Sequence, residues 1–162
     1  MARSAPKTTR ATQALDQAGL RYSLHAYDYD PDAPRIGLQA AEALGVPPGR
    51  VLKTLMAAVD GRTLCLLVAS DREVSMKRVA AAFSGKAAAM LKPTDAERLT
   101  GYHVGGISPL GQKRTFPTAI DAGSLGDPSA EIHVNGGGRG LQIRLTEGDL
   151  VAALTALVVP LT

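Results

Sequence analysis

The spacing of apolar residues predicts a helix and then a strand at the start of the chain. Apolar residues between positions 11 and 18 recur at helical spacing and stop at Gly19, a residue type that commonly ends helices. We therefore expect a helix that begins after Thr9. Residues 20–26 alternate between apolar and polar side chains, which is typical of a strand. The segment 27–34 is rich in Asp and Pro, and we expect it to be an exposed loop.

The middle of the chain predicts a short helix followed by a strand hairpin. Residues 38–44 have helical spacing, and the next residue is a glycine. Residues 51–59 form a strongly apolar run, which predicts a buried strand. The dipeptide Asp60-Gly61 is typical of a tight hairpin turn, and the apolar run 63–69 is the expected returning strand.

The second half of the chain mixes short helices with strands. We expect helices over 75–83, 94–100 and 149–157, and strands over 117–120, 131–135 and 141–145. Thr94 and Glu97 fit a capping box at the start of the second of these helices, and Thr146 fits the N-cap of the third. Interleaved helices and hairpins favour a single α+β domain, with helices packed on a mixed, largely antiparallel sheet, over a doubly wound parallel fold.

The composition fits one globular domain. The chain has 162 residues, of which 45% are hydrophobic and 20% are charged, so it can bury a core without disulfides or a structural metal. We expect residues 1–8 to form a flexible basic tail ahead of one domain over 9–162. No apolar run is long enough to span a membrane, which favours a soluble, cytoplasmic protein. The single cysteine, Cys65, excludes an intrachain disulfide and a multi-cysteine zinc site.

The charge of the chain narrows the partners that it could bind. A formal net charge of +3 tolerates a polyanionic partner, but it does not indicate a dedicated, tight nucleic-acid binder. The sequence has no Trp and few other aromatic residues, which argues against a surface on which bases stack. The sequence leaves the oligomeric state open.

Two glycine-rich segments are candidates for a binding loop. Gly105 and Gly106 open the first, where a backbone without side-chain bulk can approach a ligand and its N–H groups can hold a carbonyl or an anion. The alternative is a sharp turn that requires positive φ. The segment is not the phosphate loop of nucleotide hydrolases, because Gln112 separates its last glycine from Lys113. The glycines in 136–140 join two expected strands, and they fit either a flexible hairpin end or a ligand loop.

The remaining polar residues provide one candidate, Lys53. It lies in an apolar strand, so its charged head must reach water, a carboxylate or a bound anion. Cys65 lies in an equally apolar strand without a basic neighbour, and we interpret it as an inert core residue. The acidic residues in 28–32 and 71–73 match no calcium loop and are interpreted as solvated loops. The three histidines lack the spacing of a metal site, and no catalytic triad can be assembled.

Three stretches of the chain share their sequence with a known family. They are Val-Leu-Lys-Thr-Leu at 51–55, Gly-Tyr-His-Val-Gly-Gly-Ile-Ser-Pro-Leu-Gly-Gln at 101–112 and Val-Asn-Gly-Gly-Gly-Arg-Gly-Leu at 134–141. Together they resemble the YbaK family of free-standing aminoacyl-tRNA deacylases, and the resemblance extends over nearly the whole chain from Thr9. It implies an α+β domain related to the editing insertion of bacterial prolyl-tRNA synthetases, without a cofactor. The implied substrate is tRNA(Pro) wrongly charged with a small amino acid, chiefly cysteine in this branch.

The resemblance also implies roles for single residues. Lys53 would anchor the terminal adenosine or its phosphate as a point charge. The backbone around Gly105, Gly106 and Ile107 would hold the aminoacyl carbonyl and stabilise the developing oxyanion. The residues expected to bind the substrate around these groups are Tyr27, Ser108, Asn135, Arg139 and Gln142.

The mechanism that the resemblance implies uses the substrate as its own nucleophile. In the cysteine-removing branch, the substrate thiol attacks its ester carbonyl and releases the tRNA and a cyclic thiolactone. Asn135 stands where the family often has Ser, and Gln142 where some members have an acidic residue, so amino-acid specificity is less constrained than reaction class. A complex with prolyl-tRNA synthetase would supplement a weak affinity for tRNA. The alternatives are removal of another small amino acid such as alanine, or a non-catalytic module that binds a nucleotide or a protein.

Overall fold

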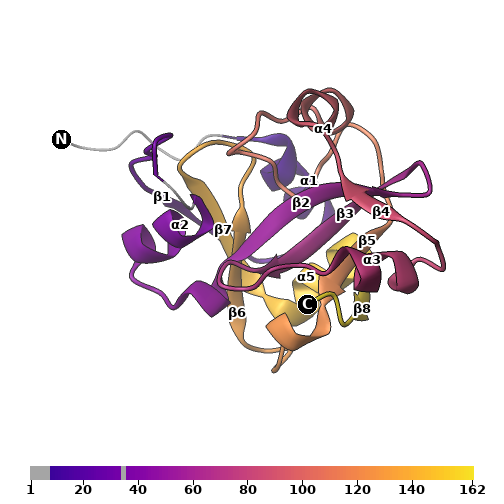
Figure 1. Ribbon diagram of the computed structural model, residues 1–162. Coiled ribbons are helices and arrows are strands. Elements are labelled where there is room, and N and C mark those ends of the chain that lie inside the picture. Colours follow the sequence, from indigo (N-terminus) through magenta and orange to yellow (C-terminus); the bar gives the residue numbers. More distant parts are fainter. Residues whose placement is uncertain (1–7, 34–35) are drawn as a thin grey trace.

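Two packed sheets form the framework of the protein. The computed structural model describes residues 8–33 and 36–162, and the strands in this part of the chain form a three-stranded and a five-stranded sheet (Figure 1). The three-stranded sheet is antiparallel and has the order β1 (Ser23–Ala26), β7 (Leu141–Thr146), β6 (Glu131–Asn135). The five-stranded sheet has the order β4 (Ala88–Met90), β2 (Leu52–Val59), β3 (Arg62–Ala69), β5 (Thr118–Asp121), β8 (Leu157–Val159). Its pairs β3–β5 and β5–β8 are parallel, so the predicted mixed, largely antiparallel α+β domain is confirmed, with its strands divided between two sheets.

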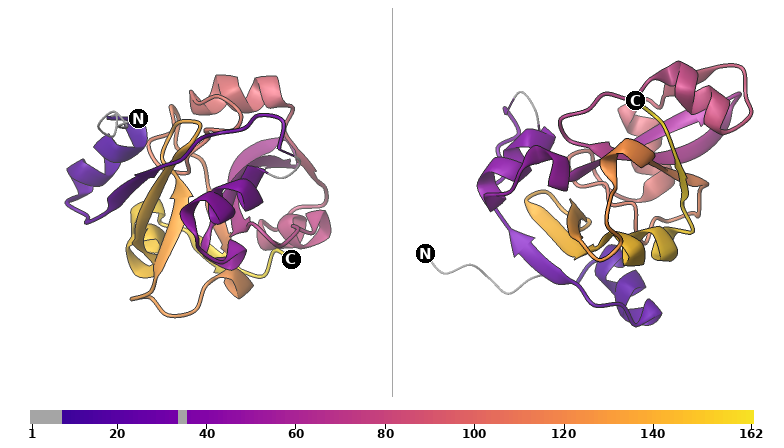
Figure 2. Two further views of the ribbon diagram at one scale, coloured as in Figure 1. Left: turned by 90° about the vertical axis from the view of Figure 1, so that its left-hand side faces the viewer. Right: turned by 90° about the horizontal axis from the view of Figure 1, so that it is seen from below.

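Five α-helices of the described chain pack around these sheets. They are α1 (Arg10–Ala18), α2 (Ile36–Leu44), α3 (Met76–Ala82), α4 (Pro93–Thr100) and α5 (Glu147–Leu154), and short 3-10 turns lie at η1 (Pro48–Arg50) and η2 (Ala122–Ser124). Figure 2 shows α2 in front of the orange strands of the three-stranded sheet, where Ala40 and Ala41 pack with Tyr27 and Val51. None of the helices described here has the length and apolar character needed to cross a bilayer.

The main core lies between the two sheets. Alternate residues of the three-stranded sheet, such as Ile132 and Ile143, pack against Met56 and Leu67 of the five-stranded sheet. Helix α1 contributes Leu15 to this core. Successive residues of a strand point to opposite faces, so the intervening polar residues of β6 and β7 lie on the face away from this core. That polar face of the sheet carries two of the predicted site residues, Asn135 and Gln142.

Several turn and cap predictions are confirmed. Gly19 ends α1 with φ +69°, as predicted. The structure adds that Thr9 caps this helix by accepting a hydrogen bond from the Thr12 N–H. Asp60 and Gly61 both have positive φ, +49° and +82°, as a two-residue hairpin turn requires. Thr146 caps α5 by accepting from the Asp149 N–H.

Other local predictions are wrong. The capping box at Thr94 does not form, because Pro93 occupies the first position of α4 and Lys92 is an N-cap without a side-chain hydrogen bond. The last helix ends at Leu154 rather than continuing to Leu157, since Thr155 adopts the left-handed conformation and the chain then enters β8.

The loop predictions are confirmed only in part. The segment after β1 has no regular structure over its described residues, yet Tyr27 is only 7% exposed, so this loop is not exposed throughout. Most of the predicted basic tail, residues 1–7, lies outside the described residues, and Thr8 is exposed.

A gap between the sheets determines where a ligand can enter. Val51 forms an isolated parallel bridge with His133 of β6, which joins the two sheets at the start of β2. Further along, the same edge of β2 pairs with β4 only from Ala57 to Val59. Between these points no strand among the described residues pairs with this edge. The backbone edge of residues 52–55 therefore has no strand partner among the described residues, and these residues border an opening.

Candidate functional site

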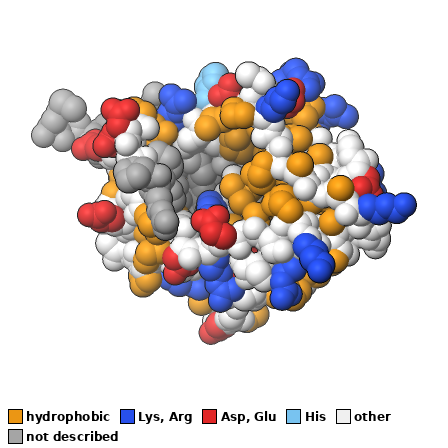
Figure 3. All heavy atoms as spheres, in the orientation of Figure 1, with side chains coloured by type: hydrophobic (Ala, Val, Ile, Leu, Met, Phe, Trp, Pro, Cys, Tyr) orange, Lys and Arg blue, Asp and Glu red, His pale blue; other side chains and the backbone are white. Residues whose placement is uncertain are grey.

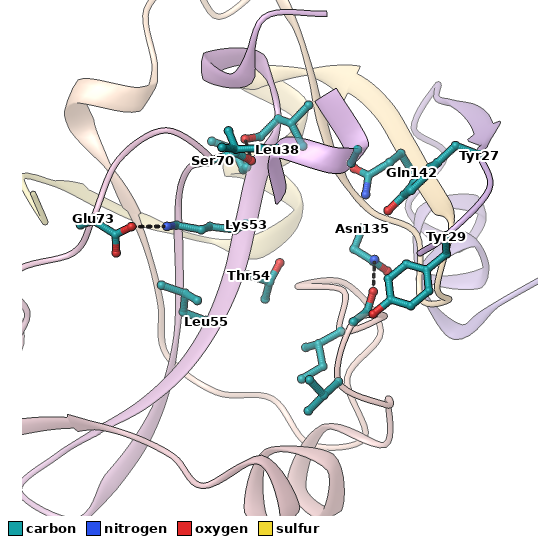
Figure 4. A pocket seen from close by; sticks show the side chains of 16 residues that line it. Tyr27, Tyr29, Leu38, Lys53, Thr54, Leu55, Ser70, Glu73, Asn135 and Gln142 are labelled. Atoms are coloured by element: carbon teal, nitrogen blue, oxygen red, sulfur yellow. Dashed lines mark hydrogen bonds and ion pairs between the residues drawn. The ribbon is translucent and has the colours of Figure 1, made fainter. Parts of the chain in front are cut away.

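A pocket of about 380 Å³ lies beside the unpaired edge of β2 and over the polar face of β6 and β7. Six of the nine site residues predicted from sequence line it, namely Tyr27, Lys53, Gly105, Ile107, Asn135 and Gln142 (Figure 4). The other lining residues are Tyr29, Leu38, Ala40, Val51, Leu52, Thr54, Leu55, Ser70, Glu73 and Val104. Figure 3 shows hydrophobic side chains gathered on the right-hand side of the hollow in this face. Its volume lies within the range of pockets that bind small molecules or a nucleotide end.

Lys53 reaches the pocket from β2. Its Nζ lies 3.5 Å from the Glu73 Oε1, so the charged head of this strand residue meets a carboxylate (Figure 4). The Lys53 side chain is 23% exposed, whereas the Glu73 side chain is 87% exposed. The aliphatic part of Lys53 is thus covered while its ammonium stays accessible from the pocket.

Val104, Gly105 and Ile107 of the turn at residues 103–107 line the pocket. The Gly106 N–H donates to the His103 carbonyl at 2.8 Å, so this amide is used inside the turn. The amides of Gly105 and Ile107 have no hydrogen-bond acceptor within the described residues. Gly105 has φ +91°, so the segment is both the sharp turn and the candidate donor site that its sequence allowed.

Asn135 connects this turn to the second glycine-rich segment. Its Nδ2 donates to the Gly105 carbonyl at 3.2 Å, and its Oδ1 accepts from the N–H groups of Gly137 and Gly138. Arg139 adds a bond from its Nε to the Val104 carbonyl at 3.0 Å. The two segments, 30 residues apart in the sequence at Gly105 and Asn135, therefore form one unit.

Direct main-chain packing holds the two segments together. A Cβ atom placed on Gly106 would lie 2.9 Å from the carbonyl carbon of Gly138 and 3.0 Å from the Arg139 nitrogen. Real Cβ contacts are not that short, and a backbone cannot give way as a flexible side chain can. Glycine is thus required at 106 by packing.

Three of the predicted site residues do not line the pocket. Besides Gly106, Ser108 is fully buried, and its Oγ accepts from the Leu110 N–H at 3.2 Å inside the loop. Arg139 lies beside the pocket, where its guanidinium stands 5.7 Å from the centre of the Tyr29 ring. Ser108 thus supports the loop, and Arg139 covers an aromatic wall residue.

Tyr27 and Gln142 form the inner polar end of the pocket (Figure 4). Burial raises the pKa of Tyr27, and the neighbouring Tyr29 adds to this, so its hydroxyl stays protonated at neutral pH. Gln142 is 4% exposed, and its Oε1 has no hydrogen-bond partner among the described residues. A buried acceptor without a partner is costly, so this end of the pocket favours a ligand that donates hydrogen bonds.

Sequence reasoning missed several wall residues. Tyr29 lies in the Asp- and Pro-rich loop, and Glu73 lies in a segment interpreted as solvated, so neither had a distinguishing signal. Thr54 follows Lys53 in β2, and strand alternation places consecutive side chains on opposite faces. Both line the pocket because it opens along the edge of β2, and this edge could not be located from the sequence.

Cys65 is confirmed as a core residue. It is fully buried between the sheets, and burial raises the pKa of its thiol to about 12. A thiol with such a pKa does not form a reactive thiolate near neutral pH. Within the described residues, no group of three or more His, Cys, Asp and Glu side chains is arranged to hold a metal ion.

Comparisons with known proteins show what this chain is similar to. The family sequence model called aminoacyl-tRNA editing domain matches residues 30–153 of this chain. A protein of Enterococcus faecalis that carries the name Cys-tRNA(Pro)/Cys-tRNA(Cys) deacylase EbsC is 31% identical over 150 residues, which cover 91% of this chain and 88% of that protein. The proline–tRNA ligase of Acidithiobacillus ferrooxidans is 31% identical over 88 residues, which cover 54% of this chain and 15% of the ligase.

A solved structure shares the whole fold. It is described as a trans-editing enzyme for prolyl tRNA synthetase, and it superposes with a TM-score of 0.79 at 26% identity, covering 94% of each chain. The family match and the relative from E. faecalis each extend over most of the chain. This chain therefore belongs to the aminoacyl-tRNA editing domain family.

Proposed function

We propose that this protein is a trans-editing deacylase that removes cysteine from mischarged Cys-tRNA(Pro). The observation that carries the proposal is a pocket lined by Lys53, Gly105 and Ile107, in which the two backbone amides have no hydrogen-bond acceptor among the described residues. The name of the E. faecalis relative supports cysteine as the amino acid. A synthetase site built for proline cannot strongly exclude a similar or smaller side chain, so a second site is needed to remove the error.

Each polar group of the pocket has a task in this reaction. Lys53 binds the terminal adenosine or its phosphate, for which a point charge is sufficient. The amides of Gly105 and Ile107 receive the ester carbonyl oxygen as it becomes negatively charged. A preorganised donor of this kind contributes about 3–4 kcal/mol to transition-state stabilisation. Asn135 supports them by holding the Gly105 carbonyl on its other side.

The nucleophile comes from the substrate. The cysteine thiol gives up its proton, and its sulfur attacks the carbonyl carbon. The bond between this carbon and the ribose oxygen then breaks, the ribose hydroxyl takes up a proton, and the cysteine leaves as a cyclic thiolactone. Holding both reacting groups in one pocket removes much of the entropic barrier. Cys65 takes no part, because it lies in the core and does not line the pocket.

Deacylation of purified, precharged tRNA tests the proposal. We expect turnover of Cys-tRNA(Pro), a loss of about tenfold or more in kcat/KM for Lys53→Ala, and nearly unchanged activity for Cys65→Ser. The Ser-charged tRNA should react far more slowly than the Cys-charged one, because a hydroxyl is a weaker nucleophile than a thiol. If Cys-, Ala- and Ser-charged tRNA all remain intact, the protein is a binding module rather than an enzyme.

We further propose that the protein acts in the cytoplasm beside prolyl-tRNA synthetase. The similarity to a structure described as a trans-editing enzyme for that synthetase supports this partner. A net charge of +3 implies a weak affinity for tRNA alone, which a complex would supplement. Adding prolyl-tRNA synthetase to the deacylation assay should therefore lower KM, and an unchanged KM would contradict the partnership.

A further inference from the structure

The ion pair between Lys53 and Glu73 is weakly held. The two charged atoms lie 3.5 Å apart, and Glu73 belongs to the irregular segment between β3 and α3. Its carboxylate has no other hydrogen bond to the described residues, and its side chain is 87% exposed. Exposed pairs of this kind contribute little to stability and separate readily.

Two other ion pairs of the protein are built differently. Glu147 lies 2.7 Å from the Arg50 guanidinium, is 3% exposed, and also accepts from the Gly126 N–H. Asp121 lies 3.1 Å from Arg72 and is 1% exposed. These carboxylates are fixed by burial and by several donors, whereas the carboxylate of Glu73 can swing away from its lysine. A ligand that binds Lys53 can therefore displace the Glu73 carboxylate.

Glu73 and the proposed substrate compete for the same ammonium group. Both Lys53 and Glu73 line the pocket, so a phosphate that binds Lys53 comes close to the Glu73 carboxylate. Like charges at such distances repel, and the repulsion weakens with added salt. A carboxylate tethered beside the lysine also acts at an effective concentration in the millimolar range, on the order expected for short linkers. Small free carboxylates must exceed that concentration to displace it.

We propose that Glu73 is a specificity-determining residue that acts as a tethered competitor for Lys53. The phosphates of a tRNA end displace it, because the polyanion brings several charges at once. The single carboxylate of a free amino acid does not, so the pocket stays available in a solution rich in free amino acids. This inference rests on the proposed function, since it takes the tRNA end as the ligand.

A binding experiment without turnover tests this role. A fluorescent, uncharged RNA hairpin ending in CCA is titrated with the full chain and followed by anisotropy. We expect Glu73→Gln to bind it about three- to tenfold more tightly at low salt, with the gain shrinking at high salt. Asp71→Asn removes the same charge from an exposed residue two positions away that does not line the pocket, and it should change binding less than about twofold.

The gain must depend on Lys53. In the Lys53→Met background, Glu73→Gln should no longer tighten binding, because the contested ammonium is missing. Free proline at millimolar concentration should weaken RNA binding to Glu73→Gln more than binding to the natural protein. With Cys-tRNA(Pro), Glu73→Gln should lower KM and leave kcat unchanged, whereas a residue that orients Lys53 for the reaction would lower kcat when changed.

Three results would overturn the inference. They are unchanged or weaker RNA binding by Glu73→Gln, an equal gain for Asp71→Asn, and a gain that persists without Lys53. Because the hairpin carries no amino acid, this test is independent of catalysis. A Lys53-dependent gain without deacylation of any charged tRNA would refute the proposed function and leave the role of Glu73 standing.

Discussion

At the scale of the residue, the site depends on positions where a side chain is missing. Gly106 lets the turn at 103–107 approach the 136–140 loop so closely that main chain packs on main chain, and Gly105 leaves room for the Tyr29 side chain. The positive φ of Gly105 and the bond from Asn135 then fix the direction of the neighbouring amides. Substitutions at these glycines should reduce catalysis by moving the neighbouring amides, because they remove no reacting side chain.

Gly106→Ala tests this packing. The added methyl group would collide with the backbone of Gly138, so we expect a loss of about 1–3 kcal/mol in the free energy of unfolding and a large loss of kcat. Urea denaturation and the deacylation assay measure the two effects. Gly126→Ala is the matched control, since a Cβ there meets no atom within 4 Å and its φ is not positive. Equal behaviour of the two variants would contradict the packing argument.

At the scale of the element, single residues predicted the turns and helix ends that depend on them alone. The Asp60-Gly61 turn, the helix end at Gly19 and the cap at Thr146 follow from single residues, and all three could be predicted from the sequence. The strands β4 and β8 could not be found, because each has three residues and exists through pairing with a distant strand. The failed cap at Thr94 has a local cause instead, since the neighbouring Pro93 starts that helix earlier.

The three-stranded sheet contains a histidine pair that makes its stability depend on pH. His25 and His133 lie on β1 and β6, with ring centres 5.7 Å apart. Burial lowers the pKa of both below the ordinary value of 6.5; nearby Arg144 also lowers both, while Glu131 opposes the shift. For His133, a hydrogen bond with the Arg50 backbone also opposes it.

The unfolded chain therefore takes up protons first as the pH falls. The contribution of the pair to stability is complete above pH 6.5 and is lost progressively below it, as the pH approaches the folded values. We expect the urea midpoint to fall between pH 7.5 and 5.5. His133→Gln should flatten the dependence of the urea midpoint on pH. The side chain of His103 is 86% exposed, so His103→Gln should leave this dependence unchanged. A parallel decline in both variants would refute the assignment.

At the scale of the whole molecule, segments that are distant in the sequence are held together by hydrogen bonds to single buried residues such as Asp121. Asp121 at the end of β5 accepts hydrogen bonds from the Leu161 N–H, Ser124 and Arg72. Burial alone would raise the pKa of Asp121, but these donors outweigh it and hold the pKa below its usual range. One carboxylate thus ties the end of the chain and the segment after β3 to the five-stranded sheet.

Asp121→Ala should release these segments together. It leaves buried donors without a partner, so we expect the free energy of unfolding to fall by about 2–3 kcal/mol. Asp95→Ala is the control, because its side chain is 44% exposed and its ion pair is with Arg98 of the same helix; its effect should stay below about 1 kcal/mol. Thermal or urea unfolding measures both, and a loss below 1 kcal/mol for Asp121→Ala would contradict the anchoring role.

The site shows where prediction from sequence ends. Lys53, Gly105 and Asn135 could be placed in one pocket because each lies in a stretch that resembles a known family. Thr54, Tyr29 and Glu73 could not, because they join the pocket only where β2 loses its strand partner between two sheets. That position depends on long-range pairing, which no local pattern records.

The main-chain contact between Gly106 and Gly138 allows the shape of the cavity to change without moving the proposed donor groups. The groups proposed to bear the reaction are braced by backbone, while the cavity wall is made of replaceable side chains such as Leu38 and Thr54. Wall residues can therefore mutate without disturbing the donors. Substitutions in the wall can thus change the shape of the cavity in single steps, while the backbone contact that holds the turn at 103–107 stays in place.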